Sequence, residues 1–251
     1  MASTKVFIVT GASKGLGAAI AKYLLGQSHK VVATARSADL LESLKRAHPG
    51  QVEYVAGDMT EPKMPESLTE LAIKSFGRLD GLVINHGRLV SERMANSSIE
   101  TFKNLYDVNV FSALAMAQSA LPQLRKTNGC IVWVSSGAAR NAYVGWSAYG
   151  SSKAVLNSLS THLAAEEKGI TSVTIEPGRV DTGMQAQIRS SGKDSMDKAE
   201  YEDFVNAFTS GKLVKPEQSG HVIARVAIDP RKDLSGKNLK WNSPELASYQ
   251  E

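Results

Sequence analysis

Cysteine is nearly absent from this chain, and so are long apolar runs. The 251 residues include one cysteine, Cys130, so no intramolecular disulfide is possible, and this usage is typical of a reducing compartment. Its place in the apolar run 129–134 predicts a small buried strand residue. No apolar stretch approaches the roughly 18 to 20 residues that cross a membrane, and residues 1–5 carry no secretion signal. We therefore expect a soluble, cytoplasmic protein.

Blocks of one charge, metal-ligand clusters and internal repeats are missing too. The 29 Lys and Arg residues are scattered among 25 Asp and Glu residues, which leaves a formal net charge of +4. Without a basic block, nucleic acid is not an expected partner, whereas an anionic cofactor suits the balance. The five histidines and the cysteine form no ligand cluster, so no metal is expected. No linker divides the chain, which predicts one domain over residues 1–251.

Short apolar, β-branched runs alternate with helical patterns along the chain. Near-continuous apolar strands separated by helices indicate an α/β protein with a doubly wound parallel sheet covered by helices on both faces. The polar region of about 184–198 follows a predicted strand end and is expected to be a flexible flap over the ligand site. The predicted strands span 6–10, 30–35, 52–56, 81–85, 130–134 and 171–175, and the predicted helices 15–27, 40–47, 65–76, 99–126 and 149–167.

A glycine-rich turn joins the first predicted strand to the first helix. Gly11, Gly15 and Gly17 allow a tight turn and a close approach of the backbone to a pyrophosphate. The free N–H groups and the dipole of the helix start favour its negative charge. The spacing differs from the standard G-x-G-x-x-G pattern, and such turns also occur as purely structural turns. The position at the head of a βαβ unit favours phosphate binding.

Tyr149 and Lys153 stand four residues apart in a predicted helix. Positions i and i+4 share a helix face, so the phenol and the ammonium group would occupy one small volume. A cation beside a phenol favours the phenolate and lowers the pKa of Tyr149 toward neutral pH. The same spacing is common on helices without a catalytic role, so a catalytic interpretation of the pair needs support from other motifs in the chain.

The glycine-rich turn and the Tyr149/Lys153 pair have further company along nearly the whole chain: Asn85-His86-Gly87, Asn109, Ser136 and Pro177-Gly178. The order and intervals of these segments resemble the short-chain dehydrogenase/reductase family. The resemblance implies a single Rossmann-type domain with about seven parallel strands, a nicotinamide cofactor and carbonyl–alcohol redox chemistry. His86 replaces the alanine of the family's Asn-Asn-Ala-Gly segment. We interpret it as a tolerated loop histidine and not as a proton donor.

The resemblance assigns the reacting centre to Asn109, Ser136, Tyr149 and Lys153. Ser136 lies thirteen positions before Tyr149 and would hold the carbonyl oxygen while Tyr149 protonates it. Ser135 is the alternative candidate for the serine that holds the carbonyl oxygen. Lys153 would bind the nicotinamide ribose and lower the pKa of Tyr149, and Asn109 would position a water that leads to Lys153.

Cofactor contacts are expected from the loops that follow several strands. Asp58 matches the position that binds the adenine amino group, with a turn or a helix cap as the alternative. The backbone of Val180 would meet the nicotinamide carboxamide, and Thr182 would lie near the diphosphate. By resemblance the contacts are made by Gly11, Ser13, Lys14, Gly15, Leu16, Gly17, Arg36, Asp58, Met59, Asn85, Gly87, Tyr149, Lys153, Pro177, Gly178, Val180 and Thr182.

The charge at the end of the second strand predicts NADPH or NADP+ as the cofactor. NAD enzymes of this fold place an acidic residue there to bind the adenosine ribose. This chain has Ala35 and Arg36 instead. Arg36 can offer a planar fork to a 2′-phosphate, and Lys14 can approach the same group from the glycine loop. Each basic residue alone is more often a solvated surface charge.

The substrate is expected to be a small carbonyl compound. Tyr143, Trp146 and Met184 would form an aromatic and adaptable wall, with packing in the core as the alternative for each. Such a wall suits reduction of a ketone or a benzil-like vicinal diketone to a secondary alcohol. An NAD(H)-dependent alcohol or steroid dehydrogenase and a non-enzymatic NADP(H)-binding regulator are the alternatives. Family members commonly form homodimers or homotetramers, so one of these is expected. The likeness to sepiapterin reductases and fungal benzil reductases lies in residues 135–139, 145–150 and 181–185.

Overall fold

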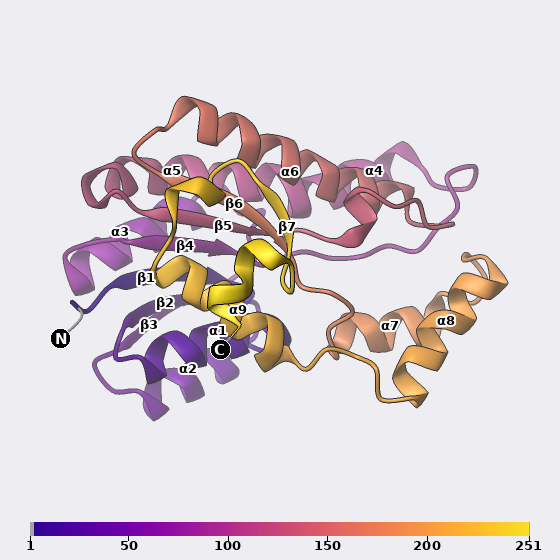
Figure 1. Cartoon of the computed structure of the whole chain (residues 1–251), viewed down its shortest axis with the longest axis horizontal. Coiled ribbons are helices and arrows are strands. Elements are labelled where there is room, and N and C mark those ends of the chain that lie inside the picture. Colours follow the sequence, from indigo (N-terminus) through magenta and orange to yellow (C-terminus); the bar gives the residue numbers. More distant parts are fainter. Residues whose placement is uncertain (1–2, 251) are drawn as a thin grey trace.

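A parallel sheet forms the centre of the protein, described here from a computed structural model of residues 3–250 (Figure 1). Within these residues seven strands pair in the order β3-β2-β1-β4-β5-β6-β7, and every neighbouring pair is parallel. The strand order reverses between β1 and β4, which confirms the doubly wound Rossmann-type fold. The strands are β1 (Val6–Thr10), β2 (Lys30–Ala35), β3 (Val52–Ala56), β4 (Gly81–Ile84), β5 (Cys130–Val134), β6 (Thr171–Glu176) and β7 (Asn238–Lys240).

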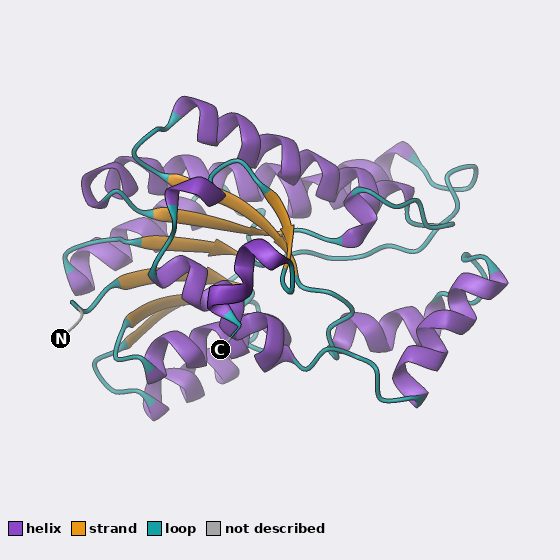
Figure 2. Cartoon of the chain, viewed as in Figure 1, coloured by secondary structure: helices purple, strands orange, loops and turns teal. Residues whose placement is uncertain are grey.

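Helices cover both faces of the sheet (Figure 2). Apolar side chains of α1, α2 and α9 pack on one face, and those of α3, α5 and α6 pack on the other. The interior strands β1, β2, β4, β5 and β6 are buried on both sides, whereas the edge strands β3 and β7 are largely not. The helices are α1 (Gly15–Gly26), α2 (Ala38–Ala47), α3 (Met64–Phe76), α4 (Ile99–Tyr106), α5 (Ser112–Thr127), α6 (Ser147–Glu166), α7 (Gly183–Ser191), α8 (Lys198–Thr209) and α9 (Pro216–Ile228).

The predicted helix over 99–126 is interrupted. A π-helical turn, η1 (Asp107–Phe111), separates α4 from α5. Asn109 lies in this turn with 1% of its surface exposed, and its side chain bonds outside the helix, which the sequence period cannot reveal. The other predicted helices agree with the observed ones to within two residues at each end.

The last strand, β7, was not located from the sequence. It has three residues, and only Leu239 is buried. An edge strand this short carries no apolar run, so its pairing with β6 had to come from the fold.

The segment predicted as a flap contains helix α7 and a short connection to α8. Figure 1 shows both helices set apart from the sheet, beyond its carboxyl ends. Val180 and Val214 form a parallel bridge at the base of this α7–α8 lobe. The flexibility of residues 184–198 stays a prediction.

Cys130 is fully buried in β5, as its apolar neighbours predicted. Among residues 3–250, no helix combines the length and the apolar character needed to cross a membrane.

Candidate active site

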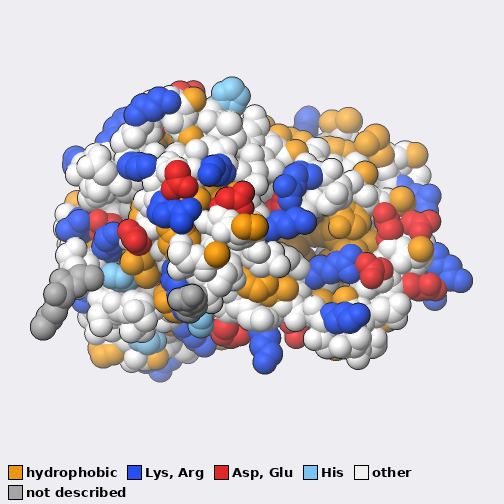
Figure 3. Space-filling view, viewed as in Figure 1, with side chains coloured by type: hydrophobic (Ala, Val, Ile, Leu, Met, Phe, Trp, Pro, Cys, Tyr) orange, Lys and Arg blue, Asp and Glu red, His pale blue; other side chains and the backbone are white. Residues whose placement is uncertain are grey.

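The predicted site residues come from loops that follow the strands and from the helices α1, η1 and α6, around the reversal of strand order between β1 and β4. Open α/β sheets bind their ligands at this place. Figure 3 shows a surface that is hollowed between the body over the sheet and the α7–α8 lobe, with basic and acidic side chains interspersed around it.

The glycine loop after β1 has the backbone that its sequence requires. Gly11 and Gly15 adopt φ values of 67° and 56°, in the left-handed region that favours glycine. A Cβ on Gly17 would lie 2.2 Å from the carbonyl oxygen of Gly11, so no larger residue fits. Ser13 and Leu16 complete this turn. The N-cap residue of α1, Lys14, makes no side-chain cap bond, and the first turn of that helix has no acidic residue. These uncapped N–H groups fit the diphosphate of a dinucleotide.

Lys14 and Arg36 are both exposed, at the ends of β1 and β2. Within residues 3–250, no acidic side chain lies within ion-pair distance of either. The glycine loop is held against β2 by the bond from the Ala12 N–H to the Thr34 carbonyl oxygen, at 3.0 Å. The cationic groups of Lys14 and Arg36 are therefore available to an anionic group of a ligand.

Asp58 forms the turn that was the alternative to adenine binding. Its Oδ1 accepts from the Thr60 N–H and from the Thr60 hydroxyl, both at 2.9 Å. These two bonds, with the nearby Arg36, lower the pKa of Asp58. Met59 is buried against the α3 side of the core, so its side chain packs inside the protein. Adenine binding at Asp58 stays a prediction.

Asn85 supports the glycine loop. Its Nδ2 donates to the carbonyl oxygens of Thr10 and Gly11 at 3.0 and 3.2 Å. Gly87, two residues on, faces the reacting centre, because a Cβ there would lie 3.3 Å from Asn109 Oδ1 and 3.5 Å from Lys153 Nζ.

The loop after β6 lies against the glycine loop. Gly178, which follows Pro177, has φ of 81°, and a Cβ there would meet the Trp241 ring at 3.1 Å. The methyl of Thr182 lies 3.0 Å from a Cβ built on Gly15. The structure thus brings the loop 177–182 against the glycine loop, as predicted for two segments that share one cofactor.

The two candidate serines, Ser135 and Ser136, have different surroundings in the structure. The Ser135 hydroxyl donates to Asn157 Oδ1 at 2.6 Å and is therefore committed to packing beneath α6. Ser136 Oγ accepts from the Ala138 N–H at 3.2 Å, and the hydroxyl lies close enough to the Tyr149 phenol to oppose the rise of its pKa. Ser136 is the serine that can share a substrate oxygen with the tyrosine.

The expectation that Lys153 lowers the pKa of Tyr149 is wrong for this structure. Burial raises the pKa of Tyr149 above its ordinary value, and the hydrogen bond with Ser136 opposes the rise in part. The ammonium group of Lys153 lies 5.9 Å from the centre of the tyrosine ring and donates to the Val134 carbonyl oxygen at 2.9 Å. Tyr149 is therefore protonated at neutral pH, the form that a proton donor needs.

The pKa of Lys153 is also shifted from its ordinary value. Burial lowers its pKa to about 8, because a desolvated ammonium group loses its hydration. The unfolded chain keeps this proton up to about pH 10.5, so between these values the unfolded state binds more protons. The stability of the folded protein therefore rises with pH across this window.

We expect the Lys153→Met variant to be more stable than the wild type at pH 7, by about 1 to 3 kcal/mol, because it removes a buried charge at similar side-chain length. Urea unfolding of the cofactor-free proteins at pH 7 and pH 9.5 measures the difference. The advantage should shrink by up to about 2 kcal/mol at the higher pH. An advantage that stays constant or grows with pH contradicts the assigned burial cost.

Asn109 contacts the backbone of the loop after β4. Its Oδ1 accepts from the Arg88 N–H at 2.9 Å, and its Nδ2 donates to the Arg88 carbonyl oxygen and to Ser152 Oγ at 2.9 and 3.0 Å. Ser152, which the sequence reasoning missed, precedes Lys153 and joins η1 to the tyrosine helix. The water path from Asn109 to Lys153 stays a prediction.

Aromatic side chains gather beside Tyr149. Trp146 packs edge-on against the Tyr149 ring at 5.8 Å and lies 5.0 Å from the Tyr143 ring. Phe204 of α8 joins them, 5.2 Å from Trp146, and Met184 packs on the same cluster. Phe204 was missed because its helix lies far from the other residues in sequence. Apolar rings thus pack against one side of the Tyr149 ring as part of a small hydrophobic core.

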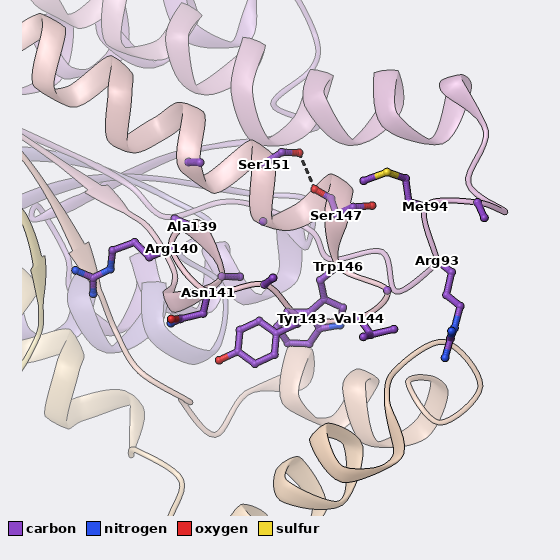
Figure 4. A pocket seen from close by; sticks show the side chains of 16 residues that line it. Arg93, Met94, Ala139, Arg140, Asn141, Tyr143, Val144, Trp146, Ser147 and Ser151 are labelled. Carbon is purple, nitrogen blue, oxygen red and sulfur yellow. Dashed lines mark hydrogen bonds between the residues drawn. The ribbon is translucent and has the colours of Figure 1, made fainter.

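A cavity of about 730 Å³ opens next to this cluster but is not the catalytic cleft. Neither Ser136 nor Tyr149 lines it. Its wall includes Ser147 and Ser151, where the Ser151 hydroxyl donates to the Ser147 carbonyl oxygen at 2.7 Å (Figure 4). In the part of the chain that is described, no group of three or more metal-ligating side chains is found.

A parallel sheet with a glycine loop at its switch point and a Ser136–Tyr149–Lys153 centre defines a class of nicotinamide-dependent oxidoreductases. Residues 5–193 match the family described as short chain dehydrogenase, and the chain belongs to this family. The resemblance expected from the sequence is confirmed.

Relatives span nearly the whole chain. An uncharacterized oxidoreductase of Schizosaccharomyces pombe is 40% identical over 242 residues, with 95% of this chain and 97% of that protein covered. A benzil reductase ((S)-benzoin forming) of Saccharomyces cerevisiae is 35% identical over 260 residues, with 98% and 99% covered. The crystal structure of a short chain dehydrogenase/reductase from S. cerevisiae matches with a TM-score of 0.96 at 36% identity, with 98% of this chain and 100% of that chain covered.

Proposed function

We propose that this oxidoreductase is an NADPH-dependent carbonyl reductase that converts a ketone or a vicinal diketone to a secondary alcohol. The observation that carries the proposal is that the Ser136 hydroxyl lies close enough to the buried phenol of Tyr149 to act on its pKa. Two hydroxyl groups that meet at one point can hold and protonate the same carbonyl oxygen.

Each residue of the centre has a proposed task. Ser136 orients the substrate oxygen, and Tyr149 gives it a proton as negative charge develops there. A bound reduced nicotinamide supplies the hydride. Lys153 holds the ribose side of the cofactor next to Gly87, and Asn109 fixes the loop that carries Gly87 through its bonds to Arg88.

NADPH is proposed over NADH from the charges at the ends of β1 and β2. Lys14 and Arg36 are exposed there, and Ala35 stands where NAD enzymes carry an acid. Arg36 suits a phosphate because its guanidinium can donate two parallel hydrogen bonds.

The substrate class is proposed from the aromatic wall and from the relative named as a benzil reductase. Half-buried Tyr143 and the buried rings of Trp146 and Phe204 form an apolar cluster beside Tyr149, which favours a carbonyl compound with flat substituents. We also propose a cytoplasmic location and a homodimer or homotetramer, with no nucleic-acid or membrane partner.

The test is a panel of carbonyl compounds with NADPH. We expect NADPH oxidation with benzil, used as the diketone probe, and with isatin, because both are flat and carry two adjacent carbonyl groups. A quinone and an aliphatic aldehyde complete the panel. Absorbance of NADPH follows turnover, and chromatography identifies the hydroxyketone.

Other outcomes point to the alternatives. Higher turnover with NADH than with NADPH would favour an alcohol or steroid dehydrogenase. NADPH binding without oxidation across the whole panel would contradict the carbonyl reductase and favour a cofactor-binding regulator.

A further inference from the structure

His86 departs from the family pattern, as Ile84 also does, and its ring joins two elements. The Nδ1 atom lies 2.8 Å from Thr10 Oγ1 at the end of β1. The Nε2 atom lies 2.8 Å from Ser112 Oγ at the start of α5. A tolerated loop histidine has no need of either partner, so the sequence-based interpretation understates this residue.

One assignment of protons satisfies all these contacts. The Ser112 hydroxyl donates to the Val108 carbonyl oxygen at 2.7 Å, so Ser112 Oγ accepts from His86 Nε2–H. Thr10 Oγ1 already accepts from the N–H groups of Asn85 and His86 at 2.9 and 3.2 Å. Its own proton has two acceptors, the Val83 carbonyl oxygen at 3.3 Å and His86 Nδ1 at 2.8 Å, and the shorter contact favours His86 Nδ1. The ring is then the neutral Nε2–H tautomer.

The charged groups around the ring favour the same state. Burial and the nearby ammonium group of Lys153 lower the pKa of His86 to about 4, against a smaller opposing effect of Asp58. A proton on Nδ1 would also face an oxygen that already accepts two N–H groups.

This bridge ends at Ser112, the first residue of α5, directly after the π-helical turn that carries Asn109. The Ser112 hydroxyl continues it to the Val108 carbonyl oxygen inside that turn. The loop that holds Gly87 is thus tied to η1 twice, through the His86 ring on one side and through the Arg88 backbone on the other. The position of the ring sets how closely Gly87 approaches Asn109 and Lys153.

We propose that His86 is a positioning residue of the reaction, which holds the glycine-loop end of β1 and the Asn109 turn at a fixed separation through Thr10 and Ser112. The alanine of the family pattern cannot span this gap. The proposal deepens the carbonyl reductase function and depends on it for its kinetic effect.

The kinetic test compares His86→Ala, Ser112→Ala and the double variant in the reduction of benzil by NADPH. We expect kcat of His86→Ala to fall about 10-fold or more, because small displacements of a reacting geometry are costly, while fluorescence titration shows that NADPH still binds. The double variant should be no slower than His86→Ala, since Ser112 acts through the ring. His86→Gln should recover part of the rate, because its amide can still donate to Ser112.

The matched control is His162→Ala, an exposed histidine on α6, which should keep wild-type kcat. An unchanged kcat in His86→Ala, or losses that multiply in the double variant, would overturn the proposal.

A second measurement works without turnover. Hydrogen exchange of peptides that cover residues 107–112, in the cofactor-free full chain, should be about tenfold faster in His86→Ala than in the wild type or His162→Ala. Equal exchange overturns the positioning role even if no ketone is reduced. An inactive wild type with the expected exchange difference overturns the proposed function instead and leaves the bridge established.

Discussion

Replacing Tyr149 by phenylalanine is expected to lower kcat for ketone reduction by about 10²- to 10⁴-fold, the usual contribution of a positioned proton donor. The change removes one oxygen and keeps the ring that packs against Trp146. NADPH affinity should therefore stay close to that of the wild type, and the folded structure should be retained. Steady-state kinetics with benzil and fluorescence titration with NADPH measure the two effects separately.

The matched control for this variant is Tyr54→Phe. The Tyr54 hydroxyl bonds Glu42 at 2.8 Å on the α2 side of the protein, away from the reacting centre, so its loss should leave kcat unchanged. Substantial turnover in Tyr149→Phe would mean that another group delivers the proton and would overturn the proposed mechanism.

The second large effect is expected on cofactor choice. The double variant Lys14→Ala/Arg36→Ala should lose about 10²-fold or more in NADPH affinity, because each charge-assisted hydrogen bond to the 2′-phosphate is worth about 1.5 to 3 kcal/mol. NADH lacks that phosphate, so its affinity should change little. The measured quantity is the ratio of the NADH and NADPH dissociation constants, and a ratio that stays at the wild-type value would refute the assignment.

General surface charge has to be separated from this local effect. The control variant Lys22→Ala/Arg46→Ala removes the same charge from exposed positions on α1 and α2 and should keep the NADPH preference. The loss in Lys14→Ala/Arg36→Ala should also diminish at high salt, since exposed charges are screened.

Much of the fold could be read from local patterns. The strands of the sheet interior are buried on both faces, so their apolar runs are long enough to identify without any alignment. The edge strand β7 could not be identified from the sequence, because one buried residue in three forms no hydrophobic pattern. The break at η1 was indicated only by the resemblance of Asn109 to an asparagine that interrupts a helix in the family. The apolar period does not show it, because the Asn109 side chain binds Arg88, a partner about twenty positions away.

The site shows the same division. Spacing put Tyr149 and Lys153 on one helix and the glycine loop between the first strand and helix, and the structure has the two residues on α6 and the loop between β1 and α1. Spacing favoured Ser136 over Ser135, but the decision came from Asn157, which takes the hydroxyl of Ser135. Phe204 and the His86 bridge had no local signal at all.

The sequence by itself determined the alternation of strands and helices, the family and the candidate chemistry, because these depend on residue order and on contacts within one helical turn. Only the tertiary structure decided the direction of the Tyr149 pKa, which burial raises, and the partners of Ser135, Asn109 and His86. Burial and hydrogen bonds between distant segments arise only once the chain has folded, so no spacing along the sequence encodes them directly.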